Sequence, residues 1–337
     1  MRGTYNTYSR KFSFSAPQTF IPVLLACIIC WIVSYWYSVG YPVYGEVSAT
    51  PLWNFICQVL PGKEFTYIIG MILMFGGAFL LHRANYALAL IREKTILPFL
   101  FYVLFISTNP DFFPLKSTSV GVFCLILAIY QLFISYHDPE ARSKAYNTAL
   151  LIGIGSLLWI HLLWFLPLFW IGMYSFRSLT PRTFAASLLG VGTIYWFLLG
   201  WCAWEGNFAP FTQSFSVLFK IRLLSIGEIV LLDWIGIFAI ALLTLAASIN
   251  IITHDYEDTL RSRQFLSFLI MMAVWAFCLY LLYEQVSEEF LETACVPSAI
   301  LIAHFFTVMR GKFIIGLFYI TLVLLIALLF IRLWNFL

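Results

Sequence analysis

Charged residues are scarce in this sequence. Asp, Glu, Lys and Arg make up only 10% of its 337 residues, whereas soluble domains carry roughly 25%. Hydrophobic residues make up 62%, so a soluble globule of this composition would have too few polar groups to cover its surface. The composition therefore excludes an ordinary soluble protein and predicts a chain that lies largely within a lipid bilayer.

Signatures of two kinds of catalytic machinery are also missing. No glycine-rich phosphate-binding loop precedes a lysine, which argues against an ATP-driven motor. The 5 histidines include no His-x-x-x-His pair, and the 7 cysteines are scattered through apolar sequence. We therefore expect no metal and no other cofactor, and the net charge of +3 gives no reason to expect nucleic acid as a partner.

Long apolar runs are abundant. Hydropathy predicts about eleven membrane segments, several of which are as long as a bilayer span requires. The expected segments are 20–39, 65–81, 95–107, 117–136, 148–160, 162–175, 183–203, 229–249, 265–282, 294–308 and 313–333. We predict an all-α, polytopic transmembrane helical bundle in which residues 1–337 form a single integral membrane domain.

Three of these segments are short for a bilayer. The run 95–107 would rise only roughly 20 Å as a helix, against a hydrocarbon core of about 30 Å. Segments 148–160 and 162–175 are similarly short and flank His161. Two interpretations stay open. The short or re-entrant elements border a cavity, or interfacial Trp and Tyr residues extend them to ordinary length.

The placement of Lys and Arg predicts the orientation. With a cytoplasmic N-terminus and an external C-terminus, most basic residues lie inside, as the positive-inside rule requires. The basic residues left outside are Lys63, Lys116, Lys220, Arg222 and Arg332. This map requires a hairpin that turns near His161, rather than one long helix kinked at Pro167. It leaves two longer external connections, 40–64 and 204–228, each long enough for an interfacial helix or a lid.

Two blocks of sequence combine Asn, Pro and Arg with apolar runs. The first is NYALALIREKTILPFLFYVLFISTNP, from Asn85 to Pro110, and the second runs from Tyr146 to Trp196. In these blocks the chain resembles an uncharacterised family of polytopic inner-membrane proteins from Bacteroidota, a domain of unknown function. The matching positions include Asn85, Pro98, Asn147, Pro167 and Arg182. The resemblance implies the inner membrane of a two-membrane bacterium and supplies no activity. Thr183 stands where the family usually has Glu.

One hypothesis is an enzyme of envelope glycolipid or polysaccharide biogenesis that uses a lipid-linked substrate. It needs an external carboxylate to take a proton from the acceptor, and cations for the lipid phosphate. The catalytic candidates are Asp111, Glu46 and Glu205, and the phosphate-binding candidates are Lys220 and Arg222. Asp111 follows the short third segment, so we expect it near or below the outer membrane surface and close to these cations. In the alternative interpretation Asp111 only caps a helix in a solvated turn.

The alternative function is a non-catalytic membrane component, or a carrier for a lipid or a small solute. It needs no essential carboxylate, and it predicts interfaces rich in small residues such as Gly76, Gly77, Gly153 and Gly155. In the alternative interpretation these glycines serve ordinary packing within the fold. The partners expected under the two hypotheses are the lipid bilayer, a lipid-linked substrate and other membrane proteins.

The remaining polar residues give three further expectations. The acidic stretch YEQVSEEFLET, residues 283–293, is expected to form an external loop. Glu228 and Asp233 are expected to pair near the headgroups, and His304 is expected to be a hydrogen-bonded packing residue. No other predicted span holds an unambiguous mid-membrane charge, which weakens the case for a proton- or sodium-coupled transporter.

Overall fold

A computed structural model describes residues 17–37, 50–59, 62–224, 231–254, 258–309 and 311–336 of the chain. These described residues form thirteen α-helices and several short 3-10 turns, and no β-strand occurs among them. Eight helices are long and apolar enough to cross a membrane, and 97–107 and 160–175 are shorter apolar elements. The prediction of an all-α, polytopic helical bundle is confirmed.

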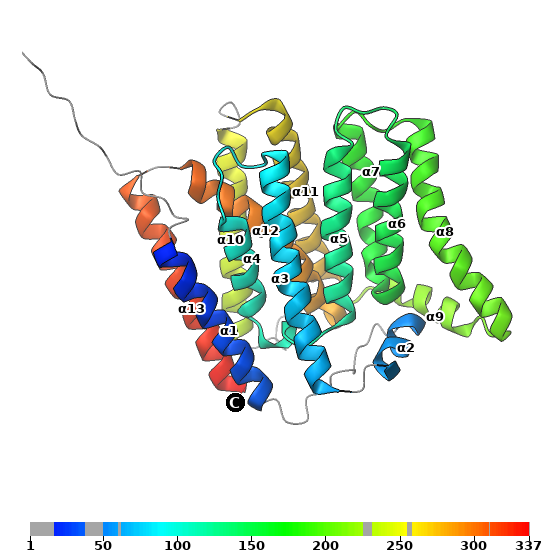
Figure 1. The fold of residues 1–337 in the computed structure, drawn as a ribbon, viewed down its shortest axis with the longest axis horizontal. Helices are drawn as coiled ribbons and strands as arrows, with labels where there is room; N and C mark the ends of the chain where they lie inside the picture. Colours follow the sequence, from blue (N-terminus) through cyan, green and yellow to red (C-terminus); the bar gives the residue numbers. More distant parts are fainter. Residues whose placement is uncertain are drawn as a thin grey trace, which may run out of the picture.

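Every predicted membrane segment corresponds to a helix of the bundle (Figure 1). In chain order these are α1 (Pro17–Tyr37), α3 (Lys63–Leu88), α4 (Leu97–Ser107), α5 (Ser117–Ile134), α6 (Arg142–Leu158), α7 (Leu166–Ser175), α8 (Pro181–Glu205), α10 (Leu231–Thr253), α11 (Leu260–Leu282), α12 (Ser287–Val308) and α13 (Lys312–Phe336). Helix α12 lies at the centre of the bundle, where α4, α5, α10 and α11 pack around it.

The short helix α4 is enclosed by protein and keeps its short length. It has 11 residues, nearly all of them buried, and packs against α1, α3 and α12. At its start the Thr95 hydroxyl accepts a hydrogen bond from the Leu97 N–H (3.2 Å). After its end, the Asn109 side chain caps the 3-10 turn η1 (Pro110–Phe112). Helix α4 is therefore short because it is buried by protein contacts and has side-chain hydrogen bonds at or beyond its ends. Flanking aromatic residues do not extend it.

The hairpin near His161 is confirmed. Helix α6 ends at Leu158, Trp159 is extended, and the 3-10 turn η2 (Ile160–Phe165) leads into α7. At the other end of α7, the Phe176 carbonyl accepts a hydrogen bond from the N–H of His137, which precedes α6 (3.0 Å). Helix α7 therefore ends where α6 begins. Pro167 lies in the first turn of α7 instead of kinking a longer helix.

The bundle has two chemically different ends (Figure 1). The basic end, at the top of the view, carries Arg83, Arg92, Lys94, Arg142, Lys144, Arg177, Arg182, Arg261, Arg263 and Lys312. The acidic end, at the bottom, carries Glu284, Glu288 and Glu289 together with Lys63, Lys116, Lys220, Arg222 and Arg332. This is the segregation that the sequence predicts, and which end faces the cytoplasm stays a prediction.

Two short helices lie beneath the acidic end (Figure 1). They are α2 (Pro51–Val59) and α9 (Ala209–Leu218), and they fall within the two connections predicted to carry an interfacial helix or a lid. Helix α2 buries Trp53, exposes Phe55 and Val59, and is tied to the bundle by the Thr50 hydroxyl, which donates to the Leu158 carbonyl (3.0 Å). An exposed apolar face on a short helix at this level suits the membrane–water interface.

Candidate functional site at the acidic end

A buried arginine joins three helices at the acidic end. The Arg332 side chain, on α13, is 7% exposed, and its Nη2 lies 2.9 Å from Oδ1 of Asp233 on α10. The guanidinium also donates hydrogen bonds to the carbonyls of Thr108 (3.0 Å) and Leu232 (3.3 Å). Gly236 leaves room for it, because a Cβ there would lie 2.8 Å from Nη2. Arg332 therefore connects the ends of α4, α10 and α13.

Asp111 lies in the η1 turn beside this arginine. It is half-buried, and both Asp111 and Glu288 interact electrostatically with Arg332. Lys116 lies 3.9 Å from Oε2 of the same Glu288. Asn109, and not Asp111, caps the turn. The structure thus brings Asp111 into a charged cluster with Arg332, Glu288 and Lys116.

The predicted phosphate-binding residues lie at the same end of the bundle. The Nε of Arg222 is 2.7 Å from Oε2 of Glu284, and the Glu284 N–H donates to the Arg222 carbonyl (2.9 Å). Lys220 is exposed just after α9. Glu284 lies in the 3-10 turn η4 (Glu284–Val286), directly before α12 and one turn from Glu288. The start of α12 therefore links the Arg222 ion pair to the Asp111 cluster.

The other predicted carboxylates are placed differently. Glu46, and Glu228 as the expected partner of Asp233, lie outside the described residues. Glu205 is the exposed last residue of α8, and α8 lies on the opposite side of the bundle from α13 (Figure 1). Among the catalytic candidates that the structure describes, Asp111 is the one beside the buried arginine.

An apolar groove opens toward the lipid at the same end. It lies between α1 and α3 and has a volume of about 340 Å³. Its lining residues are Trp31, Ile32, Tyr35, Glu64, Tyr67, Ile68 and Met71. The ring of Trp31 packs against Phe113, two residues after Asp111, with ring centroids 4.6 Å apart. Lys63 Nζ lies 4.9 Å from the ring centre of Tyr35. The groove thus adjoins the segment that carries Asp111.

The acidic stretch 283–293 is mostly helical, so its prediction as a loop is wrong, and its external location stays a prediction. Helix α12 begins at Ser287, and Glu292 within it is 4% exposed. Glu292 also lies within the candidate span Glu284–Val308, close to its start, and the expectation that no other span holds an unambiguous mid-membrane charge stays a prediction. Hydropathy averaged over a window is lowered by every Glu in the window, whether the Glu side chain points into the bundle or away from it. The i, i+4 spacing of Glu288 and Glu292 is the signal that could have revealed a helix.

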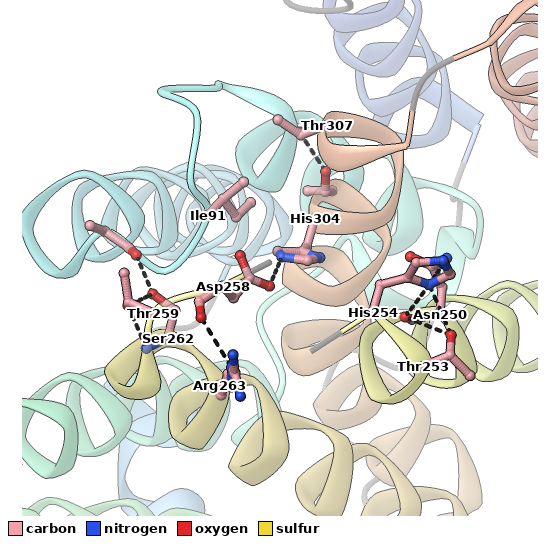
Figure 2. A network of polar contacts seen from close by, with 12 residues as sticks. Ile91, Asn250, Thr253, His254, Asp258, Thr259, Ser262, Arg263, His304 and Thr307 are labelled. Carbon is pink, nitrogen blue, oxygen red and sulfur yellow. Dashed lines mark hydrogen bonds and ion pairs between the residues drawn. The ribbon is translucent and has the colours of Figure 1, made fainter. Parts of the chain in front are cut away.

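The basic end holds a second polar network (Figure 2). His304 of α12 is 2% exposed, and its Nε2 lies 2.9 Å from Oδ2 of Asp258, which precedes α11. The Asp258 carbonyl accepts a hydrogen bond from Nε of Arg263, and the Ser262 hydroxyl donates to the Ala89 carbonyl (both 3.0 Å). These contacts hold the loops before α4 and α11 against α12. The prediction of His304 as a hydrogen-bonded packing residue is confirmed.

The residues that match the family pattern shape helix starts and loops. The Asn85 side chain accepts a hydrogen bond from the Ile91 N–H (3.0 Å) and donates to the Thr95 carbonyl (3.4 Å), which closes the loop before α4. Pro98 and Pro167 lie in the first turns of α4 and α7, where a missing N–H costs little. The other two are Asn147, half-buried in α6, and Arg182, exposed in the first turn of α8.

Comparison with known proteins gives no relative. No family model, no curated protein and no solved structure matches this chain. Its apolar helices nevertheless decide its class. It is an integral, multi-pass membrane protein. Any narrower function has to be argued from the acidic end itself.

Proposed function

We propose that this protein binds a lipid-linked substrate at the acidic end and acts in envelope glycolipid or polysaccharide biogenesis. The proposed setting is the inner membrane of a Bacteroidota-type, two-membrane bacterium. One observation carries the proposal. A lipid-facing apolar groove and a charged cluster are joined through the contact of Trp31 with Phe113. A hydrocarbon tail would lie in the groove, and its polar headgroup would meet the charges.

The ion pairs of the cluster differ in how readily they can open. Arg332 is buried and fixed by Asp233 and two carbonyl groups. Lys116, whose side chain is 20% exposed, has a long contact of 3.9 Å with Glu288, whose side chain is 52% exposed, and it lies 5.9 Å from the ring centre of Phe112. A partly exposed pair at this distance contributes about 0–1 kcal/mol, so a lipid phosphate can replace Glu288 at Lys116. Lys116 is therefore the proposed first phosphate contact, with Lys220 and Arg222 as further cations.

Asp111 is the proposed general base for an acceptor hydroxyl. It is half-buried beside Arg332, on a turn held by Asn109. The ionised carboxylate is the form of this side chain that accepts a proton. Partial burial also restricts the side chain to few poses, as catalysis by proton transfer requires.

Photo-crosslinking tests where the lipid tail binds. The purified protein would be incubated with a polyprenyl phosphate that carries a diazirine in its tail, and crosslinked peptides would be mapped by mass spectrometry. We expect crosslinks on α1 and α3 around Trp31 and Met71. Ile68→Trp should fill the groove and remove them. The matched control is Ile72→Trp, one turn further along α3, which is exposed and does not line the groove. Crosslinks spread evenly over the apolar surface would contradict the proposal.

The second candidate function is a carrier or non-catalytic component, which the groove alone would support. Asp111→Asn separates the two. If the protein is an enzyme, a strain of the source bacterium that carries this variant should lose the envelope product. The purified variant should still give the crosslink in the groove. Asp138→Asn, at an exposed turn of the basic end, is the control. An Asp111→Asn strain with normal envelope lipid and polysaccharide would favour the carrier, whose protein partners could then be sought by pull-down.

A further inference from the structure

Three exposed arginines lie around the basic ends of α6, α7 and α8, which adjoin one another (Figure 1). Arg142 is the first residue of α6, Arg177 is the second residue after α7, and Arg182 is the second residue of α8. The His137 N–H, in the connection before α6, donates to the Phe176 carbonyl (3.0 Å), which holds this connection against the end of α7. Helices α6 and α8 pack along each other. We call Arg142, Arg177 and Arg182 the arginine surface.

Each of these arginines occupies a position that the local backbone does not favour. Arg177 has a φ of 56°, in the left-handed region where glycine is the usual residue after a helix. Arg142 and Arg182 lie in the first turns of α6 and α8, where the helix dipole favours acidic side chains and neither helix has one. The positive-inside rule asks only for basic residues near this end of the bundle. The local fold therefore gives no reason for arginine at these three positions, whereas a bound anion would give one.

The charges around the arginine surface are mostly positive. In the described structure, the charged groups at the ends of α5 to α8 and at the start of α11 are the cations Arg142, Lys144, Arg177, Arg182, Arg261 and Arg263 and the carboxylates Asp138, Glu140 and Asp258. Asp138 pairs with Lys144 (3.0 Å), and Asp258 pairs with His304 (2.9 Å). No ion pair among the described residues includes a member of the arginine surface. Its three guanidinium groups are therefore open to an external anion.

The two helices next to these arginines also offer an apolar surface to lipid. Helix α7 exposes Ile171 and Tyr174, and α8 exposes Leu188. Trp170 of α7 joins the two helices, because its Nε1 donates a hydrogen bond to the Ser187 hydroxyl of α8 (3.0 Å). A ligand that has both an anionic headgroup and acyl chains can therefore contact the arginines and the apolar side chains together. A soluble anion would contact the arginines alone.

We infer that the arginine surface binds the phosphate headgroup of an anionic phospholipid whose acyl chains lie against α7 and α8. Guanidinium groups bind phosphate oxygens through paired, charge-assisted hydrogen bonds. The start of α6 adds N–H donors, because its N-cap residue Ala141 makes no side-chain cap. This inference goes beyond the proposed function, since the site lies at the opposite end of the bundle from the α1–α3 groove and uses none of the residues that line it.

Native mass spectrometry of the purified, delipidated full-length protein tests the class of ligand. The three probes are phosphatidylglycerol, which carries a net negative charge, phosphatidylethanolamine, which has a phosphate but no net charge, and glycerophosphoglycerol, which is the first headgroup without acyl chains. We expect the protein to bind phosphatidylglycerol more tightly than either of the other two. Equal affinity for the two lipids would contradict an anionic site, and equally tight binding of glycerophosphoglycerol would contradict a lipid site.

Arg177→Gly tests the place of binding without putting the fold at risk. Glycine adopts a positive φ at no steric cost, so the unfolding temperature of this variant without lipid should be no lower than that of the unmodified protein. Its affinity for phosphatidylglycerol should nevertheless fall about fivefold, because one phosphate contact is lost. Arg182→Gln, at an exposed position, should weaken binding by a similar factor. Unchanged affinity in both variants would overturn the inference.

Two control variants separate this site from general effects. His137→Gly changes an exposed residue that has the same φ of 56° at the same end, so it matches the backbone change at Arg177. Arg83→Gln removes one positive charge from α3, also at the basic end. Each control should change the affinity by less than about twofold, since exposed charges are screened by salt. If Arg83→Gln weakens binding as much as Arg177→Gly, the attraction is diffuse and the arginine surface is not a site.

Discussion

Among single residues, Arg332 should be the one whose loss most weakens the acidic end. Arg332→Met removes the partner of Asp233 and the donor to two carbonyl groups. Breaking a fully buried pair costs about 3–5 kcal/mol. The Asp233 side chain is 40% exposed and can regain water, so we expect about 1–3 kcal/mol here. Thermal unfolding in detergent, followed with a fluorophore that reacts with buried thiols such as Cys27 and Cys295, measures this loss.

Lys144→Met is the matched control, because both side chains of its pair with Asp138 are partly exposed, by 32% and 39%. It should cost less than about 1 kcal/mol. Equal losses in the two variants would show that burial of Arg332 contributes nothing.

The sequence predicts that Arg332 and Asp111 share one end of the bundle. It could not predict that they are neighbours, because Arg332 and its acceptor Thr108 are 224 residues apart and only tertiary packing brings them together.

Among the elements, the pair α6 and α8 depends on close backbone approach at Gly190. A Cβ at Gly190 would lie 2.5 Å from the Tyr146 carbonyl oxygen and 3.0 Å from the Leu150 nitrogen. Gly190→Ala should therefore push the helices apart and cost about 1–3 kcal/mol. Gly192→Ala lies on the same helix with nothing within 4 Å and should be neutral, or stabilising by up to about 1 kcal/mol. Unfolding temperatures that fall equally in the two variants would contradict this.

The sequence predicts the elements well, because apolar runs of helix length between polar turns have one simple solution in a membrane. Even the hairpin at His161 follows from the placement of Lys and Arg. Gly76, Gly77, Gly153 and Gly155 contact side chains within the fold, which is the ordinary internal packing given as the alternative. The prediction for the start of α12 was wrong for a physical reason. Glu292 is buried within the bundle, and the free-energy cost of burying it depends on tertiary packing, which an average of hydropathy over neighbouring residues does not include.

For the whole molecule, the testable property is its orientation in the membrane. The basic end should face the cytoplasm. In a cysteine-free background, Lys220→Cys should react with a membrane-impermeant thiol reagent added outside intact spheroplasts. Arg182→Cys should react only after permeabilisation. Both positions are exposed and lie at opposite ends of the bundle, so accessibility within the protein is matched. Labelling of Arg182→Cys from outside would invert the map and place the acidic end in the cytoplasm.

The neighbouring positions of α1 and α13 have a consequence for biosynthesis (Figure 1). A ribosome delivers α13 after every other described helix, so Arg332 reaches Thr108 and Asp233 only when the rest of the bundle has been inserted. Until then, Asp233 stands at the end of α10 without its arginine, and α1 lacks the helix that covers its flank. The acidic end is therefore completed only when α13 has been inserted. A nascent chain interrupted before α13 would expose both defects to the proteases that clear unfinished membrane proteins.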